Sequence, residues 1–273
     1  MQKRNSSRPD PNHVRPSVWL SVGAVWLALA ASANAAAPCP RPGTLGTYRV
    51  LSVDATATPR VGLKNFPQTL PFADHEVVLT FDDGPLTATT PRVLAALAHE
   101  CVRATFFLMG KPASEHPVLV RRIAAEGHTV ATHTWTHQYL GQIKLEEAQE
   151  EIDHGISAVE MALHGTATAI PSTPFFRFPG FESTPKLLDI LQARKIVVFG
   201  TDLWASDWNK MTPKQELKLI TERLEAAGKG IILFHDNKTH TAAMLPAFLR
   251  YLRDHDYRIV HVIPAEPVAA DKH

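Results

Sequence analysis

The stretch 76–108, EVVLTFDDGPLTATTPRVLAALAHECVRATFFL, determines the fold that we expect. Its beginning, Glu76–Phe81, is rich in β-branched and apolar residues, which favours a buried strand. A Thr-Pro pair then starts an apolar pattern that predicts a helix over Pro91–Glu100, because proline suits the first turn of a helix. A second strand is expected at Ala104–Leu108. A strand, a helix and a strand in this order predict two parallel strands with a helix outside them.

The same alternation of strand and helix continues towards the end of the chain. It predicts one α/β domain built on a parallel sheet of seven strands. Periodicity alone fits either a doubly wound open sheet or a (β/α) barrel that lacks one unit. The further strands are expected at His128–Thr132, Phe175–Phe178, Ile196–Thr201, Gly230–Phe234 and Tyr257–Val262, and the further helices at Pro117–Glu126, Leu145–Leu163, Pro185–Gln192, Pro213–Ala227 and Ala242–Asp254.

Composition limits the classes of protein to which this chain can belong. It has 273 residues, of which 45% are hydrophobic, and this is enough to bury the core of one domain of barrel size. The formal net charge is +1, and no long run of one sign occurs. We therefore expect no nucleic-acid partner and no binding to an anionic membrane surface.

The first 35 residues have the pattern of a targeting signal. Several basic residues precede the apolar run Val18–Ala31, and Ala33-Asn34-Ala35 has the small residues of a cleavage site. The apolar run is shorter than the ~20 residues that a transmembrane helix needs, so we expect cleavage and no stable membrane span afterwards. An uncleaved membrane anchor is the alternative. The expected location is outside the cytoplasm, in the periplasm or secreted.

We divide the chain into a signal peptide (1–35), an N-terminal extension (36–75), a main domain (76–264) and a C-terminal tail (265–273). The extension is rich in Pro, Gly and Thr and shows no sustained period. We expect it to cross the surface as an extended segment.

Cys39 in the extension and Cys101 in the main domain are the only cysteines. Outside the cytoplasm they could form a disulfide that ties the extension to the domain. The alternative is one free thiol in a loop and one thiol in a core helix.

Polar and ionisable residues gather where the expected strands end. The carboxyl ends of parallel strands lie on one side of a sheet or barrel, and active sites form there. Residues that are far apart in sequence therefore converge on one rim. The residues concerned are Asp82, Asp83, His133, His137, Arg177, Asp202 and His235.

His133 and His137 are the first candidates for metal ligands. A spacing of four on a helical turn would place both imidazoles on one face, with Cβ atoms about 5–6 Å apart. With one carboxylate they would form a set of ligands that suits catalytic Zn²⁺, because a position stays open for water. The alternative is that two histidines in a polar loop are solvated or cap a helix. The nearby pair Asp82 and Asp83, at another strand end, favours the metal site.

Asp82 and Asp83 need two separate roles, because adjacent side chains on an extended backbone point in different directions. One carboxylate can bind a metal while the other faces an attacking water molecule. The alternative is a turn, since Asp-Asp-Gly-Pro is favourable loop chemistry. Two adjacent carboxylates after a buried strand are costly unless a cation neutralises one of them, and this favours a functional pair.

His235 follows an apolar strand and could act as a general acid, since an unperturbed histidine titrates near neutral pH. Asp202 could hydrogen-bond the imidazole and hold it charged. Arg177 could orient the free carboxylate through a bidentate contact. Either of these two residues could instead be structural. No role is assigned to Asp207 or Trp208.

These motifs, in this order, resemble those of the polysaccharide deacetylases of carbohydrate esterase family 4. The likeness covers 76–264, which would be the catalytic domain, and it implies a distorted (β/α)7 barrel. The motifs that carry it are TFDDGP at 80–85, HTWTH at 133–137 and LFH at 233–235.

The resemblance also implies a role for each residue of these motifs. The general base would be Asp82 and the general acid His235. The metal ligands would be Asp83, His133 and His137. The implied cofactor is a divalent metal, Zn²⁺ first, with Co²⁺ or another divalent ion as alternatives.

The chain departs from the family pattern in two motifs. In the third motif Gly180, followed by Phe181, replaces an aromatic residue, and the backbone N–H of Gly180 could still bind the oxyanion. In the fourth motif Asp202 and Asp207 are two residues further apart than usual. We expect Asp202 to be the partner of His235.

The sequence thus predicts an exported hydrolase that removes N-acetyl groups from chitin-like oligosaccharides or peptidoglycan. Trp135, Trp204 and Phe181 could stack on the sugar rings of such a substrate, or could be packing residues. An O-acetyl esterase acting on xylan would use the same residues. A secreted glycan-binding protein without activity is the remaining alternative, but binding alone needs neither the ligands nor the acid–base pair.

Overall fold

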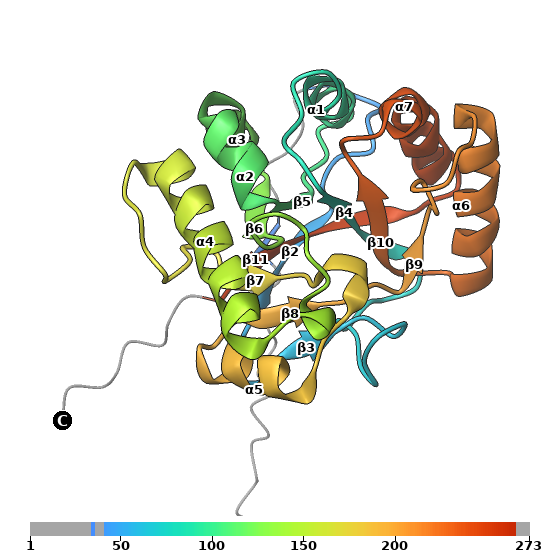
Figure 1. Cartoon of the computed structure of the whole chain (residues 1–273). Helices are drawn as coiled ribbons and strands as arrows, with labels where there is room; N and C mark the ends of the chain where they lie inside the picture. The colour runs from blue at the N-terminus through green and yellow to red at the C-terminus, as the bar shows by residue number, and fades with distance from the viewer. Residues whose placement is uncertain (1–33, 36–40, 266–273) are drawn as a thin grey trace, which may run out of the picture. The chain divides into compact units, whose positions relative to one another are not determined.

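The fold is a twisted, mainly parallel sheet with helices around it (Figure 1). The computed structural model describes residues 34–35 and 41–265, and all of them belong to one compact unit. In chain order the elements are β1 (Asn34–Ala35), β2 (Arg49–Val53), β3 (Arg60–Val61), β4 (Glu76–Asp82), α1 (Thr90–His99), β5 (Thr105–Leu108), α2 (Gly110–Glu115), α3 (Pro117–Ala125), β6 (Thr129–Thr132), η1 (Leu140–Gln142), α4 (Leu145–His164), β7 (Phe175–Phe176), η2 (Pro179–Phe181), α5 (Pro185–Ala193), β8 (Val197–Phe199), β9 (Leu203–Trp204), α6 (Pro213–Ala227), β10 (Gly230–His235), α7 (Thr239–Asp254) and β11 (Arg258–Pro264).

Seven parallel strands form a distorted barrel. In the order β9, β10, β4, β5, β6, β7 and β8, each strand pairs with the next, and within the described residues no pairing joins β8 to β9. The register of the longest pair runs from Gly230 opposite Val77 to His235 opposite Asp82. The expectation of an α/β fold with a distorted (β/α)7 barrel is confirmed.

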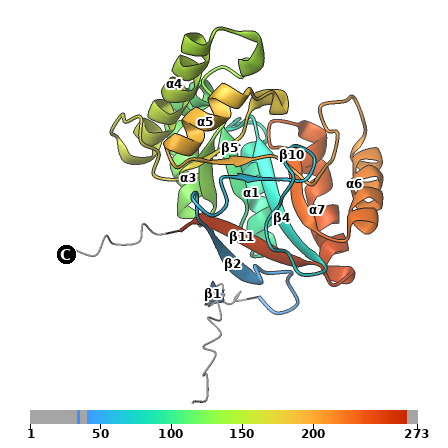
Figure 2. The same cartoon turned by 90° about the horizontal axis from the view of Figure 1, so that it is seen from below.

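One of the expected strands lies outside this ring. β11 pairs with β2 along its length, and with β4 only at Arg258 and Ile259. Because β10 occupies one edge of β4, β11 and β5 share the other edge. Figure 2 shows β2 and β11 side by side at this end of the sheet. The seventh strand of the ring is instead β9, which has only two residues and therefore no detectable period.

The stretch before β4 contributes to the sheet, which we did not expect. β2 pairs in parallel with β11, and β3 pairs in parallel with β8. Val61 and Phe72 from this stretch are buried in the cluster inside the barrel. Arg49 of β2 also forms an ion pair of 2.7 Å with Glu76 at the start of β4. The expected boundary between extension and domain thus falls inside one packed unit.

Two expectations fall on parts of the chain that the structure does not describe. Cys39 lies outside the described residues, so its pairing with Cys101 stays a prediction. The signal peptide, except for 34–35, also lies outside them. Within 41–265, none of the helices combines the length and the apolarity that a membrane crossing requires.

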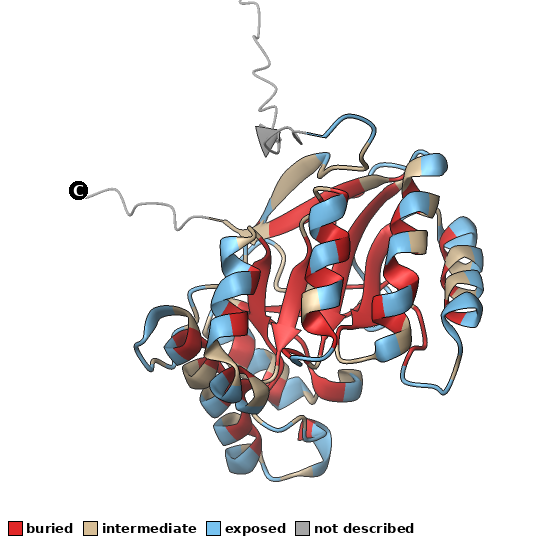
Figure 3. Cartoon of the chain, turned by 90° about the horizontal axis from the view of Figure 1, so that it is seen from above, coloured by how far each residue is buried: buried red, intermediate tan, exposed pale blue. Residues whose placement is uncertain are grey.

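Side chains alternate between the two faces of each barrel strand. Val78 of β4 and Ile231 of β10 belong to the cluster inside the barrel, whereas Phe81 packs in the cluster under the helices. Figure 3 shows buried strands covered by helices that are buried on their inner side and exposed on their outer side. Because side chains along a strand alternate between its two faces, the last inward-facing residue of β4 is Asp82 and that of β10 is His235.

Two of the helices, α5 and α6, begin where their capping signals predict. The side chain of Thr212 and that of Gln215 form a reciprocal capping box at the start of α6. At the start of α5, the hydroxyl of Thr184 accepts a hydrogen bond from the backbone N–H of Leu187. The short helix α2 was not expected, because glycine and proline near its start are poor helix formers.

Candidate active site

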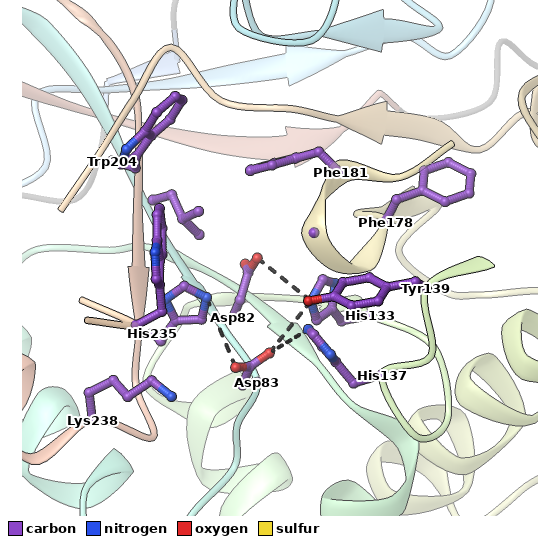
Figure 4. Close-up of a pocket in the computed structure, with 13 residues that line it drawn as sticks. Asp82, Asp83, His133, His137, Tyr139, Phe178, Phe181, Trp204, His235 and Lys238 are labelled. Carbon is purple, nitrogen blue, oxygen red and sulfur yellow. Dashed lines mark ion pairs between the residues drawn. The ribbon is translucent and has the colours of Figure 1, made fainter. Parts of the chain in front are cut away.

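The carboxyl ends of the barrel strands surround a pocket of about 520 Å³ (Figure 4). Eight of the eleven residues that we predicted for the site line it, and Trp135, Arg177 and Asp202 do not. The lining residues are Asp82, Asp83, His133, His137, Tyr139, Phe178, Gly180, Phe181, Trp204, Trp208, Leu233, His235 and Lys238.

Asp82 and Asp83 both face the pocket because the strand ends between them. Asp82 is the last residue of β4, and Asp83 has a φ of 73°. This left-handed conformation, which aspartate tolerates better than most residues, interrupts the alternation of an extended strand. The next residue must be glycine, since a Cβ on Gly84 would lie 2.2 Å from Oδ2 of Asp236.

His133 and His137 lie in a loop after β6 and not on a helical turn, so our helical interpretation of their spacing is wrong. The backbone of Thr134 has a φ of 64° and that of His137 a φ of 67°, which no α-helix contains. The ring centroids of the two histidines are nevertheless 5.0 Å apart. Nδ1 of His133 donates to the carbonyl oxygen of Arg177 over 2.7 Å, which leaves Nε2 facing the pocket.

Asp83, His133 and His137 form a cluster of three ligand groups. Oδ1 of Asp83 lies 3.5 Å from Nε2 of His133 and 3.4 Å from Nε2 of His137, and the three ligand atoms all lie within 4.8 Å of one another. This oxygen is buried and accepts no hydrogen bond from the described residues. Two imidazole nitrogens, together with a carboxylate oxygen that accepts no hydrogen bond, fit a divalent cation such as Zn²⁺.

The charge of Asp83 is stabilised by its surroundings. Burial acts to raise the pKa of this carboxyl, but the attraction of His133, His235, His137 and Lys238 outweighs burial and leaves the pKa lowered. Asp83 therefore stays ionised, as a metal ligand must.

Asp82 is held by a fully buried arginine below the pocket. Nη1 of Arg177 lies 2.7 Å from Oδ1 of Asp82 and 2.9 Å from Oγ1 of Thr80. Nη2 donates to the carbonyl oxygen of Gly200 and Nε to that of Phe199. Only one guanidinium nitrogen reaches the carboxylate, so the expected bidentate contact is wrong. The other nitrogens fix the guanidinium to the barrel wall. Oδ2 of Asp82 has no contact with Arg177 and lies 3.8 Å from Nε2 of His133.

His235 is paired with Asp207 and not with Asp202. Nδ1 of His235 lies 2.7 Å from Oδ1 of Asp207, and the backbone N–H of His235 donates to Oδ2 of the same carboxylate over 2.7 Å. Burial acts to lower the pKa of His235, but the hydrogen bond and the charge of Asp207 outweigh burial and raise the pKa to about 9. His235 is therefore protonated at neutral pH.

Asp202 has a structural position, so our assignment of it as the partner of His235 is wrong. Its carboxylate accepts hydrogen bonds from the backbone N–H of Leu63 and of Ile231, and from the hydroxyl of Thr69. These contacts join the loop after β3 to the start of β10, at the end of the barrel opposite His235. The unusual spacing between Asp202 and Asp207 was the signal that could have pointed to Asp207.

A buried hydrogen-bonded chain supports Asp207 from behind. Oγ1 of Thr241 lies 2.9 Å from Oδ2 of Asp207 and 2.9 Å from Oε1 of Glu216. Burial, together with the charge of Asp207, raises the pKa of Glu216 to about 8. Glu216 is therefore largely protonated at neutral pH. No sequence pattern indicated this chain, because its members lie in three separate segments.

Aromatic side chains form the walls of the pocket. Trp208 is 52% exposed and presents its ring at 89° to the imidazole of His235, with 6.0 Å between centroids. Trp204 packs against Trp208, with 6.3 Å between centroids. Trp135, which we expected at the rim, instead contacts His154 of α4 behind the loop. Trp204 thus lines the pocket, whereas Trp135 does not and has the packing position that was its alternative.

Gly180 lines the pocket in a conformation that requires glycine. Its φ is 57°, and a Cβ on it would lie 2.5 Å from Cε1 of Tyr139. Tyr139 is 46% exposed and closes the wall beside His137, where the ring centroids are 6.1 Å apart. Phe181 follows Gly180 into the lining, as expected. Tyr139 was missed because a lone tyrosine in a loop carries no pattern.

Comparison with known proteins places this geometry in a family. A family model described as polysaccharide deacetylase matches residues 70–199. A peptidoglycan-N-acetylglucosamine deacetylase of Bacillus cereus is 31% identical over 217 residues, which cover 74% of this chain and 76% of the relative. A chitooligosaccharide deacetylase of Rhizobium leguminosarum is 46% identical over 89 residues, which cover 33% of this chain and 41% of the relative.

A larger relative and a solved structure are also similar to this chain. A peptidoglycan-N-acetylglucosamine deacetylase of Listeria monocytogenes is 29% identical over 191 residues, which cover 69% of this chain but only 38% of the relative. The structure of a peptidoglycan deacetylase from Bdellovibrio bacteriovorus matches with a TM-score of 0.72 at 29% identity, covering 86% of this chain and 64% of that one. On fold, site and sequence, the chain belongs to the polysaccharide deacetylases of carbohydrate esterase family 4.

Proposed function

We propose that this protein is a metal-dependent hydrolase that removes N-acetyl groups from a polysaccharide outside the cytoplasm. The observation that carries the proposal is the meeting of three features in one pocket. They are the cluster of Asp83, His133 and His137, the carboxylate of Asp82, and the imidazole of His235 with its raised pKa. The N-terminal signal pattern supports export, to the periplasm or the exterior.

Asp83, His133 and His137 would hold the cation. When bound, a divalent cation lowers the pKa of a water molecule and polarises a carbonyl group. The hydrogen bond from Nδ1 of His133 to the carbonyl oxygen of Arg177 fixes the ring and its tautomer. His137 is positioned by its backbone N–H, which donates to the hydroxyl of Thr134.

Asp82 serves as the general base in this proposal. Arg177 stabilises the ionised carboxylate through Oδ1, and Oδ2 is free to accept a proton from the attacking water. Asp82 need not bind the cation, because Asp83 already supplies the carboxylate ligand. The two adjacent acids thus have the two separate roles that their different environments allow.

His235 serves as the general acid. It is charged at neutral pH, and its Nε2 faces the pocket because Nδ1 is bound to Asp207. It can therefore give a proton to the departing sugar nitrogen, which is a poor leaving group without one. The backbone N–H of Gly180, which also lines the pocket, is the proposed donor to the oxyanion of the tetrahedral carbon. Trp204 and Phe181 are the proposed stacking surfaces for sugar rings.

The substrate we propose is an N-acetylated glycan of the peptidoglycan or chitin type. The names of the relatives from Bacillus cereus, Listeria monocytogenes, Bdellovibrio bacteriovorus and Rhizobium leguminosarum support this class. Release of acetate should be measured from peptidoglycan, chitooligosaccharides and O-acetylated xylan, with Asp82→Asn as the inactive control. Release from an N-acetyl substrate supports the proposal. Release from xylan alone would make the protein an esterase with the same residues, and glycan binding without release would make it a binding protein.

A further inference from the structure

Lys238 places an ammonium group in the wall of the pocket. It is the residue before α7, in the turn after β10, and it lines the pocket near His235 and Asp83. Figure 4 shows its side chain beside both of these residues. Across 34–35 and 41–265, no hydrogen bond and no ion pair within 4 Å uses its amino group. The ammonium group of Lys238 therefore has no hydrogen-bond or ion-pair partner among the described residues.

The acidic residues of the pocket have nearer partners than Lys238, which acts on Asp83 only through the attraction of its charge. Asp82 is paired with Arg177 over 2.7 Å, and Asp207 is paired with His235 over 2.7 Å. Asp83 faces two histidines through Oδ1 and the amide of Asn237, at 3.3 Å, through Oδ2. A cation bound at the cluster would make the pocket still more positive. The ammonium group of Lys238 is thus available to pair with an anionic group of a ligand.

Acetylated glycans differ in whether they carry an ionised group that could pair with Lys238. A chitin chain carries no ionised group, whereas a peptidoglycan strand carries the carboxyl of a lactyl ether or of its attached peptide. A lysine on a flexible stem suits such a carboxylate, because its ammonium can follow the anion over several positions. A charge-assisted hydrogen bond of this kind also forms a stronger contact than a neutral one.

We propose that Lys238 binds a carboxylate of the glycan and makes the site selective for anionic over neutral acetylated glycans. This inference rests on the proposed function. It names Lys238 as a residue that determines specificity, separate from the acid, the base and the metal ligands.

The test uses one N-acetylated glycan oligomer with free lactyl carboxylates and the same oligomer with these carboxylates methyl-esterified. Binding of both is measured by calorimetry in the Asp82→Asn background, and acetate release is measured with Asp82 intact. The variants are Lys238→Met, Lys238→Arg and, as a control that removes a charge outside the pocket, Lys218→Met. Lys218 lies on α6, where it pairs with Glu222 over 3.7 Å.

We expect the protein to bind the free acid about 10-fold more tightly than the ester, as one charge-assisted contact allows, and less so at high salt. Lys238→Met should lose this preference, because KM rises for the free acid and not for the ester, while Lys238→Arg and Lys218→Met keep it. Equal binding of the two oligomers by the unsubstituted protein would overturn the inference. Equal losses on both oligomers in Lys238→Met would also overturn it. Binding preference without any acetate release would instead remove the proposed function and leave the carboxylate site.

Discussion

The carboxylate of Asp207 binds His235 twice, at the ring nitrogen Nδ1 over 2.7 Å and at the backbone N–H over 2.7 Å. This double contact fixes the imidazole and raises its pKa to about 9. A proton donor in this position is charged below that pH, so donation should fail only as the pH rises through about 9.

Replacement of Asp207 by Asn should therefore move the alkaline limit of activity downwards. Without the negative charge, burial dominates and lowers the pKa of His235, so less of the imidazole is protonated at neutral pH. We expect kcat at pH 7 to fall about 100-fold. The measurement is the pH profile of kcat/KM.

Asp202→Asn is the matched control for this change. Asp202 contacts Leu63, Thr69 and Ile231 and has no contact with His235. The substitution Asp202→Asn should lower the unfolding temperature and leave the alkaline limit of activity unchanged. If Asp202→Asn shifts the pH profile and Asp207→Asn does not, the pairing described for His235 is incorrect.

Arg177→Met should destabilise the protein as well as inactivate it. Arg177 is fully buried and makes an ion pair of 2.7 Å with Asp82, so its loss leaves a buried carboxylate without its nearest cationic partner. Breaking one side of a buried pair costs about 3–5 kcal/mol. Urea unfolding measures the loss, and the double variant Arg177→Met with Asp82→Asn should recover part of it. No recovery in the double variant would show that the two side chains are not coupled.

The cluster of Asp83, His133 and His137 predicts that Zn²⁺ stabilises the folded protein and that this effect depends on Asp83. Zn²⁺ at 100 times its Kd should stabilise the unsubstituted protein by about 2.7 kcal/mol, since it binds the folded state. Asp83→Ala should abolish the rise in unfolding temperature, because Oδ1 of Asp83 is the oxygen between the two histidines. His154→Ala, which removes a histidine of α4 outside the cluster, should keep the full rise. An equal rise in Asp83→Ala would place the bound metal elsewhere.

Two buried histidines predict how stability depends on pH. Burial lowers the pKa of His128 from 6.5 to about 3 and that of His261 from 6.5 to about 4. Their contribution is fully present above pH 6.5 and is lost as the pH falls from 6.5 towards these lowered values, because only the unfolded chain takes up the protons. Each histidine contributes a slope of about 1.4 kcal/mol per pH unit in this range.

His261→Gln should make this slope shallower. The measurement is the free energy of unfolding between pH 7 and pH 5, and His255→Gln on the exposed end of α7 is the control. A slope that is the same in His261→Gln and in the unsubstituted protein would mean that His261 is not held neutral in the fold.

The order of the elements could be predicted from the sequence because their signals are local. The strand before Asp82 and the strand before His235 are apolar runs, and the helices that begin at Pro185 and Pro213 have threonine caps. Since parallel strands bring their carboxyl ends together, the meeting of Asp82 and His235 followed from topology alone.

The parts that were missed depend on tertiary contacts or on backbone angles. β3 and β9 are two residues long, so neighbouring strands define them and not their own pattern. The positive φ of His137 replaced the expected helical turn by a loop that still brings the two histidines together. The choice between Asp202 and Asp207 depends on which of them reaches Nδ1 of His235, and spacing does not encode this distance.

The most direct test of the metal-dependent deacetylase site is acetate release from an N-acetylglucosamine oligomer by protein that has been stripped with a chelator and then supplied with Zn²⁺. We expect no release after stripping and recovery with Zn²⁺ in the unsubstituted protein. We expect no recovery in His133→Ala, because this substitution removes a metal ligand. Undiminished release by the stripped protein, or full activity in His133→Ala, would contradict the assignment of this pocket as a metal-dependent deacetylase site.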